Sequence, residues 1–197
     1  MTRPSSWTAA AARALLRETP VVLLGISLGF NAILVKQLRE RPAPPARVQL
    51  AAGTPITPVE ATTLDGQRAV IDYKGSKGTI LYYFSPSCVW CARNWDNLRA
   101  LSEGAGDRFR VVGLSNGAGT AQYVRQLGLP FATVTNVSAT FLQKYRLVGT
   151  PRTLVVSPEG RILRDWSGAY SGRTQEEVET FFSVKLPGLA AQRVAIP

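Results

Sequence analysis

The two cysteines of this chain, Cys88 and Cys91, are its only thiols in 197 residues, and two residues separate them. They closely follow the apolar run 79–84, which predicts a buried strand, and so they fall where a strand gives way to a helix. Backbone N–H groups converge at a helix N-terminus, where they stabilise a thiolate and lower the pKa of the first cysteine. The second thiol follows one helical turn later, close enough to close a disulfide. The pattern indicates a redox couple.

The absence of histidine limits what else these thiols could do. Without an imidazole the sequence excludes Cys-His proteases, Ser-His-Asp hydrolases and histidine-ligated zinc or haem. Two cysteines alone cannot complete an all-cysteine zinc site, so we expect neither a metal nor a cofactor. A purely structural disulfide is the other interpretation, although a loop this short gains least from closure.

The charge balance is basic, with 23 Lys and Arg residues against 13 Asp and Glu residues and a net charge of +10. The basic residues are scattered without a long tract, which indicates a solvated surface. Attraction to anionic lipid or to an acidic partner is the alternative. No aromatic-basic platform accompanies the charge, so no nucleic acid is expected. The length fits one domain with additional segments, and we expect a monomer.

The N-terminal part contains a charge-free apolar run, Pro20–Val35, that ends at Lys36. A run of this length is typical of a signal-peptide core or of a slightly short transmembrane helix. No Ala-x-Ala cleavage site follows; charged residues and the prolines of 42–45 favour an uncleaved anchor and a stiff linker. A cleaved signal is the alternative. We predict an N-terminal cytoplasmic segment at 1–19, a transmembrane anchor at 20–38 and a Pro/Ala-rich linker at 39–52.

The orientation of this anchor is argued from charge and from chemistry. Lys and Arg flank the apolar run on both sides, so the positive-inside rule leans only slightly towards a cytoplasmic domain. The dithiol favours the opposite side, because soluble thioredoxin serves the cytoplasm whereas the outside needs an anchored redox couple. We therefore predict a single-pass protein of the cell membrane that contacts the lipid bilayer, with its domain on the extracytoplasmic (periplasmic) side.

Strand and helix patterns alternate through the predicted domain at 53–184, which leaves a tail at 185–197 without a readable motif. Asp65 and Gly66 predict the turn of an N-terminal β-hairpin. Such alternation predicts an α/β fold with helices on both faces of a central sheet. The further strands are expected at 79–84, 109–114, 131–134, 153–156 and 161–166, and the helices at 91–101, 120–127, 138–145 and from a cap at Thr174 onwards.

A second motif, Gly149-Thr150-Pro151, precedes the predicted strand at 153–156. Proline cannot donate a hydrogen bond into a sheet, so its place beside a core strand is unusual. A cis peptide bond between Thr150 and Pro151 would resolve this and would turn the Thr150 backbone outward.

Together, the strand–Cys-x-x-Cys–helix unit and the later Gly-Thr-Pro motif resemble the thioredoxin fold. The early hairpin and the helix-strand insert at 117–134 are similar to the membrane-anchored thiol-disulfide oxidoreductases of the TlpA/ResA (redoxin) group. The resemblance covers roughly residues 53–182. It implies a thioredoxin-like fold, in which a central mixed sheet carries helices on both faces and an N-terminal β-hairpin extension.

The resemblance also implies roles for individual residues. Cys88 matches the nucleophile that attacks a substrate disulfide, and Cys91 matches the cysteine that resolves the mixed disulfide. Pro151 matches the cis-proline that faces the pair, and Thr150 would offer its backbone to an extended substrate segment. We expect Trp90, an aromatic residue beside the reactive thiol, to contact a partner.

Three positions depart from the resembled pattern. Tyr82 stands where thioredoxins keep a buried acid, and Asn94 stands where the TlpA/ResA group often carries a glutamate, so both usual proton acceptors for Cys91 are missing. We interpret Tyr82 as a core residue. The Val-Trp pair between the cysteines supplies no histidine to stabilise a thiolate, which disfavours an extreme oxidant. Arg152 has two open interpretations, as a residue that helps to hold the thiolate or as a surface residue.

Three functions are compatible with these features. The first is a thiol-disulfide oxidoreductase that reduces or exchanges disulfides of extracytoplasmic proteins and receives electrons from a membrane or thioredoxin-type donor. The second is a peroxiredoxin-like peroxidase, in which Ser85 would match that family's threonine and Arg152 would supply a charged helper. The third is a non-catalytic binding or metal-delivery module, since thiolates suit Cu(I).

Overall fold

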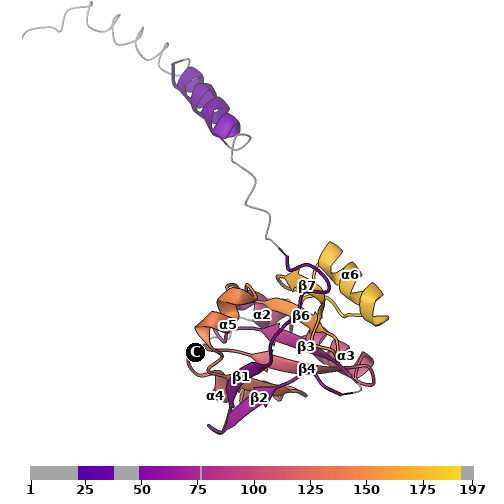
Figure 1. Ribbon diagram of the computed structural model, residues 1–197. Coiled ribbons are helices and arrows are strands. Elements are labelled where there is room, and N and C mark those ends of the chain that lie inside the picture. The colour runs from indigo at the N-terminus through magenta and orange to yellow at the C-terminus, as the bar shows by residue number, and fades with distance from the viewer. Residues whose placement is uncertain (1–21, 38–48, 76, 192–197) are drawn as a thin grey trace, which may run out of the picture. The chain divides into compact units, whose positions relative to one another are not determined.

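The structure is a computed structural model that describes residues 22–37, 49–75 and 77–191. The described residues belong to two separate units, an N-terminal helix at 22–37 and a globular domain from residue 49 onwards (Figure 1). The predicted cytoplasmic segment at 1–19 and most of the predicted linker lie outside the described residues.

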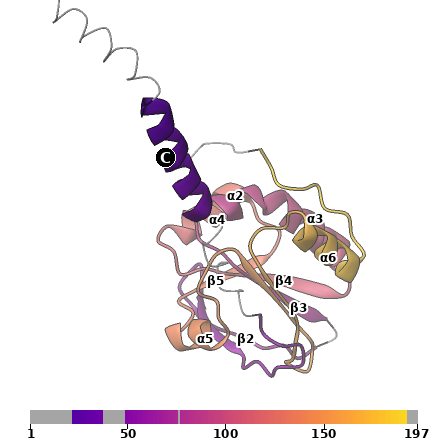
Figure 2. The ribbon, with the colours of Figure 1, turned by 90° about the horizontal axis from the view of Figure 1, so that it is seen from above.

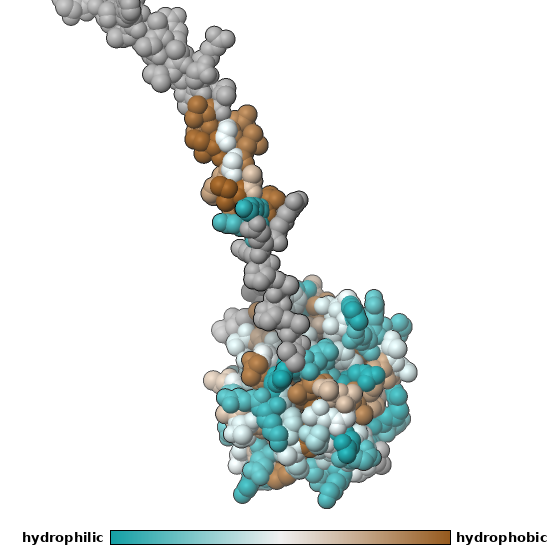
Figure 3. All heavy atoms as spheres, turned by 45° about the horizontal axis from the view of Figure 1, so that its top comes forward, coloured by the Kyte–Doolittle hydropathy of each residue, from teal (hydrophilic) through white to brown (hydrophobic). Residues whose placement is uncertain are grey.

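The N-terminal helix exposes large apolar side chains along its length, among them Leu24, Ile26 and Phe30 (Figure 3). At 22–37 it is shorter than the predicted anchor at 20–38 and shorter than the about 20 residues that cross a bilayer. Within the described ranges, no helix combines the length and the apolar character that a membrane span requires. The predicted transmembrane helix is therefore not confirmed.

A seven-stranded sheet lies at the centre of the domain, in the order β2-β1-β5-β4-β3-β6-β7. β3 pairs in parallel with β4 and antiparallel with β6, so the sheet is mixed, as predicted. The predicted hairpin is β1 and β2, which lie at one edge of the sheet because β1 pairs with β5. The strands are β1 (Val59–Thr63), β2 (Arg68–Ile71), β3 (Gly78–Tyr83), β4 (Phe109–Leu114), β5 (Ala132–Thr135), β6 (Arg152–Val156) and β7 (Ile162–Ser167).

Helices cover both faces of this sheet, which confirms the predicted thioredoxin-like arrangement. Figure 2 shows α2, α3, α4 and α6 on one side and α5 on the other. Two buried clusters fill the two interfaces, one containing Leu98 of α3 and Phe182 of α6 and the other containing Phe141 of α5. The helices are α2 (Val89–Arg93), α3 (Trp95–Gly104), α4 (Thr120–Leu127), α5 (Ala139–Lys144) and α6 (Arg173–Phe182).

The central strand β3 decides which side chains lie below the cysteines. Successive side chains of a strand point to opposite faces of the sheet. Ile80 and Tyr82 accordingly join the cluster under α2 and α3, and Leu81 joins the cluster on the α5 side. Because β3 leads directly into the Cys-x-x-Cys segment, the same alternation brings Tyr82 into the cluster that contains Cys91.

Two helix boundaries differ from the sequence expectation. The helix predicted at 91–101 is broken at Asn94, whose N–H donates to the Cys91 carbonyl and ends α2 while α3 begins at Trp95. The last helix has Gly172 rather than Thr174 at its N-cap. Gly172 has a φ of +50°, a conformation that glycine adopts without steric cost, so backbone shape outweighs a capping side chain there.

The chain beyond α6 forms a segment, residues 185–190, that we call the C-terminal strap. Leu186 is only 7% exposed and belongs to the cluster under α2 and α3. Its N–H donates to the Glu179 carboxylate over 2.9 Å, and this bond contributes most to holding the pKa of Glu179 below its usual range. Packing thus continues past residue 184, into the segment predicted as a tail.

Candidate active site

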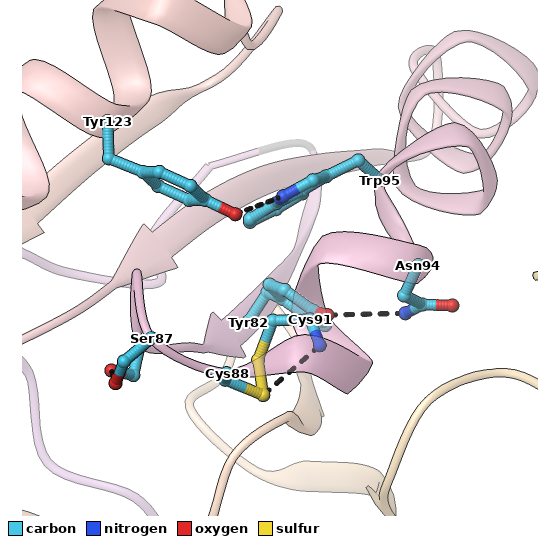
Figure 4. The surroundings of a disulfide bond; sticks show 8 residues. Tyr82, Ser87, Cys88, Cys91, Asn94, Trp95 and Tyr123 are labelled. Carbon is cyan, nitrogen blue, oxygen red and sulfur yellow. Dashed lines mark hydrogen bonds between the residues drawn. A yellow bond between two sulfur atoms is a disulfide. The ribbon is translucent and has the colours of Figure 1, made fainter. Parts of the chain in front are cut away.

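Cys88 and Cys91 are joined by a disulfide, with their Cα atoms 5.2 Å apart. Cys88 is the N-cap of α2, and its Sγ accepts a hydrogen bond from the Cys91 N–H over 3.1 Å (Figure 4). The strand-to-helix position predicted for the first thiol is therefore confirmed. A backbone N–H that contacts this sulfur favours its anionic form, because it donates to the charge that a thiolate carries.

The two sulfur-bearing residues differ in their access to solvent. Cys91 is completely buried, whereas Cys88 is half-buried. A reagent or a protein thiol approaching from solvent therefore meets Cys88 first. This asymmetry is the geometry that a nucleophile and an internal resolving thiol require.

The predicted cis peptide bond between Thr150 and Pro151 is present. The residue after it, Arg152, pairs with Tyr83 at the end of β3, which places Pro151 at the same end of the sheet as the cysteines. Pro151 is buried and Thr150 is half-buried. A cleft of about 640 Å³ opens beside this turn, lined by Gln143, Arg146, Val148, Gly149, Thr150, Pro151, Arg152 and Ser167.

Apolar side chains are exposed between the two cysteines and on the rim of the cleft. Trp90 is 54% exposed, Val89 is 42% exposed and Val148, on the rim of the cleft, is 76% exposed. These are three of the four large hydrophobic side chains that the described part of the domain exposes. The guanidinium of Arg93 lies 5.0 Å from the centre of the Trp90 ring, a cation–π contact that orients the indole without burying it.

A neutral polar network lies in the same buried layer as Cys91. The side-chain amide of Asn94 donates to the Tyr82 hydroxyl over 3.2 Å (Figure 4). The Asn94 Oδ1 accepts from Asn97 Nδ2 over 2.9 Å and from the Tyr170 N–H over 3.0 Å. The Tyr170 hydroxyl in turn bonds the Thr153 hydroxyl over 2.8 Å. The two residues that replace the expected acids are thus hydrogen-bonded to each other.

Burial keeps this network uncharged. Desolvation raises the pKa of Tyr82 well above its ordinary value, with the Asn94 hydrogen bond opposing the shift only in part. Desolvation likewise raises the pKa of Tyr170. Tyr82 is a core residue, as interpreted from the sequence, and at neutral pH its hydroxyl is a hydrogen-bond donor and acceptor rather than a base.

Aromatic residues pack in the same buried cluster as Cys91. Trp95, at the start of α3, donates its indole N–H to the Tyr123 hydroxyl over 2.8 Å (Figure 4). Its ring packs edge-on against Phe84 and Tyr82. Nothing in the sequence singles out Tyr123 or Tyr170, because both lie far from the cysteines along the chain and only the fold brings them here.

Arg152 has neither of the roles expected from the sequence. Its side chain is 8% exposed and forms two hydrogen bonds with the carboxylate of Asp165, whose side chain is fully buried. Strand alternation places Arg152 on the α5 side of the sheet with Leu154, whereas Thr153 and Val155 face the side of Cys91. Arg152 is therefore a buried structural residue, and the charged helper of a peroxidase is not found there.

The fold and the cysteine pair make this domain similar to proteins of the thioredoxin fold. The chain has the thioredoxin fold and, within it, a Cys-x-x-Cys disulfide at the start of a helix. No family model matches the sequence, and no curated protein matches it.

Three of the solved structures that match the domain do so along nearly their whole length. The thioredoxin domain of a thiol-disulfide oxidoreductase from Bacteroides vulgatus has a TM-score of 0.57 at 21% identity, covering 68% of this chain and 99% of that one. StoA from Bacillus subtilis has a TM-score of 0.51 at 16% identity, covering 64% and 97%. A secreted disulfide oxidoreductase of Mycobacterium tuberculosis, homologous to DsbE of E. coli, has a TM-score of 0.52 at 17% identity, covering 71% and 98%.

The raised tyrosine pKa values predict a loss of stability in alkali. Tyr82 and Tyr170 bind their protons more tightly when folded than when unfolded, so the unfolding free energy is unaffected below pH about 10 and falls above it. In a spectrophotometric titration, both hydroxyls should ionise only as the domain unfolds. The Tyr82→Phe protein should lose one late-titrating group. Ionisation of the Tyr82 hydroxyl at pH about 10 in the unmodified chain, with the fold intact, would contradict this account.

The buried ion pair predicts a stability effect without a redox effect. Arg152→Met leaves the buried Asp165 carboxylate without its cationic partner, with the Leu50 N–H still donating to it, and should lower the unfolding free energy by about 3–5 kcal/mol. The double variant Arg152→Met/Asp165→Leu should recover much of that loss. The pH dependence of Cys88 alkylation should not change in either protein; a shifted profile at unchanged stability would instead assign Arg152 to the thiolate.

Proposed function

We propose that this chain is a thiol-disulfide oxidoreductase that acts on disulfides of other proteins. The observation that carries the proposal is the unequal exposure of a bonded cysteine pair, with Cys88 open to solvent and Cys91 buried. The similar solved structures support it, because two of those described above, from Bacteroides vulgatus and Mycobacterium tuberculosis, are a thiol-disulfide and a disulfide oxidoreductase with the same fold.

The reaction follows from this asymmetry. In the reduced protein, the Cys88 thiolate attacks one sulfur of a substrate disulfide; a Cys88–substrate bond forms and the other substrate sulfur leaves as a thiolate. The Cys91 thiol then attacks Cys88, and its proton passes to the substrate sulfur that leaves. The intramolecular disulfide forms, the second substrate sulfur leaves, and two electrons have passed to the substrate. Run in reverse, the same steps introduce a disulfide.

Exposed apolar side chains at this end of the domain support a protein as substrate. The exposed Trp90 and Val148 offer apolar contact area, and the backbone of Thr150 lies beside the cleft where an extended segment could pair with it. Substrate contacts by Trp90, Thr150 and Pro151 are therefore part of the proposal. The protein acts as a monomer in this scheme.

The proposal places the domain outside the cytoplasm as a membrane-anchored member of the TlpA/ResA group. The apolar sequence at 20–35 supports an anchor. An anchored dithiol supports an extracytoplasmic role, because soluble thioredoxin already serves the cytoplasm. The substrates are then disulfide-containing extracytoplasmic proteins, and a membrane or thioredoxin-type donor reduces the Cys88–Cys91 pair.

Trapping tests the reaction. In Cys91→Ala the resolving step is blocked, so Cys88 should accumulate mixed disulfides with its substrates, seen as adducts on non-reducing gels that disappear with reductant. The Cys88→Ala/Cys91→Ala protein is the matched control and should form none. Absence of adducts with extracytoplasmic proteins, in a Cys91→Ala protein whose Cys88 still reacts with small disulfides, would refute the assignment.

A reporter fusion tests the location. Alkaline phosphatase matures only where its disulfides form, so its fusion to the C-terminus should be active and should sediment with membranes. Deletion of residues 20–38 should abolish both properties. An inactive phosphatase fusion, alongside an active β-galactosidase fusion at the same position, would place the domain in the cytoplasm.

A further inference from the structure

The C-terminal strap is hydrogen-bonded to the helix that carries the cysteines. The Ala190 N–H donates to the Arg93 carbonyl over 2.9 Å, and the Arg93 Nε donates to the Ala190 carbonyl over 3.0 Å. Arg93 is the last residue of α2, two positions after Cys91. This reciprocal pair therefore ties the C-terminal end of the Cys-x-x-Cys helix to a segment nearly a hundred residues away in sequence.

The strap also reaches the buried polar network. The Gly188 N–H donates to Asn97 Oδ1 over 2.9 Å. Asn97 in turn donates to Asn94, and Asn94 donates to the Tyr82 hydroxyl. Leu186, two residues before Gly188, packs the strap into the core. The strap thus contacts both sides of the break between α2 and α3, through Arg93 before Asn94 and through Asn97 after it.

α2, the helix that the strap contacts, is too short to be stable without such contacts. α2 has only five residues, and a helix of that length has no independent stability in water. While the disulfide is closed, the Cys88–Cys91 bond restrains the first turn. Once it is reduced or engaged with a substrate, the end of α2 depends on the hydrogen bonds of Arg93 and Asn94 with the rest of the domain.

We propose that the C-terminal strap positions Cys91 for its attack on Cys88. This inference rests on the proposed function and deepens it. By fixing the end of α2, the strap keeps the Cys91 sulfur near Cys88 and raises its effective concentration in the intramolecular step. Arg93 and Ala190 act through α2 and touch neither sulfur, so they are positioning residues.

The step is a thiol-disulfide exchange that glutathione can report. In the mixed disulfide, the Cys91 thiol attacks Cys88. The Cys88–Cys91 bond forms, the Cys88–glutathione bond breaks, and the proton of Cys91 passes to the glutathione sulfur that leaves. At a fixed concentration of glutathione, the ratio of closed disulfide to mixed disulfide measures the effective concentration of Cys91.

Matched substitutions in the full chain test the inference. Arg93→Met removes the guanidinium that bonds the strap, and Arg125→Met removes an equal charge from an exposed position of α4. After equilibration in glutathione buffers, acid quenching and mass spectrometry, Arg93→Met should show a ratio of closed to mixed disulfide at least threefold lower than Arg125→Met. The potential of the pair should rise correspondingly by about 14 mV, since tenfold corresponds to about 30 mV.

A second pair of variants separates the strap from the other contacts of Arg93. Ala190→Pro removes the N–H that bonds the Arg93 carbonyl and leaves the arginine in place, whereas Ala190→Ser keeps that N–H. Ala190→Pro should lower the ratio in the same direction, and Ala190→Ser should match the unmodified chain. If Ala190→Pro does not fold, as judged by circular dichroism, the arginine pair decides alone.

The possible failures are distinguishable. Equal ratios within both pairs of variants, in proteins that exchange normally with glutathione, would overturn the positioning role while leaving the redox function intact. An unmodified chain that forms neither mixed nor closed disulfide in any buffer would overturn the proposed function, and the inference with it.

Discussion

The buried side-chain amide of Asn94 connects the parts of the domain on which the candidate site depends. It reaches β3 through Tyr82, α3 through Asn97 and the chain before α6 through Tyr170, while the backbone N–H of Asn94 ends α2 at the Cys91 carbonyl. A fully buried amide is costly unless its donors and acceptors are satisfied, so these contacts are mutually dependent. The position of the short cysteine helix follows from that requirement.

The same network gives the site a chemistry different from the one its resemblance implied. Where an acid would exchange protons with the buried thiol, Tyr82 and Asn94 form a neutral pair. A carboxylate in place of either residue alone would be buried against a partner selected for an uncharged neighbour, and that costs several kcal/mol. The two departures from the expected pattern are best understood as one feature, in which an uncharged hydrogen bond takes the place of a titrating group.

Much of the fold could be predicted because it depends on local periodicity. The apolar run 79–84 predicted β3, the Asp65-Gly66 turn predicted the hairpin, and the proline before β6 predicted the cis peptide bond. The break at Asn94, the burial of Arg152 and the docking of the strap were not predictable in this way. Each depends on a polar partner elsewhere in the chain, namely Tyr170 for Asn94, Asp165 for Arg152 and Asn97 for the strap, and only the folded chain identifies those partners.

The burial of Cys91 directly behind a solvent-facing Cys88 has a consequence for oxidative damage. Peroxide that reaches Cys88 would convert its thiolate to a sulfenic acid, the first and reversible step of cysteine oxidation. A resolving thiol held within bonding distance condenses with that group, expels water and returns the closed disulfide before a second oxidant arrives. Cys91, which no solvent reaches, is itself protected from the irreversible sulfinic and sulfonic stages. The different exposure of the two sulfurs thus gives this site a built-in route back from the sulfenic acid, before the irreversible stages are reached.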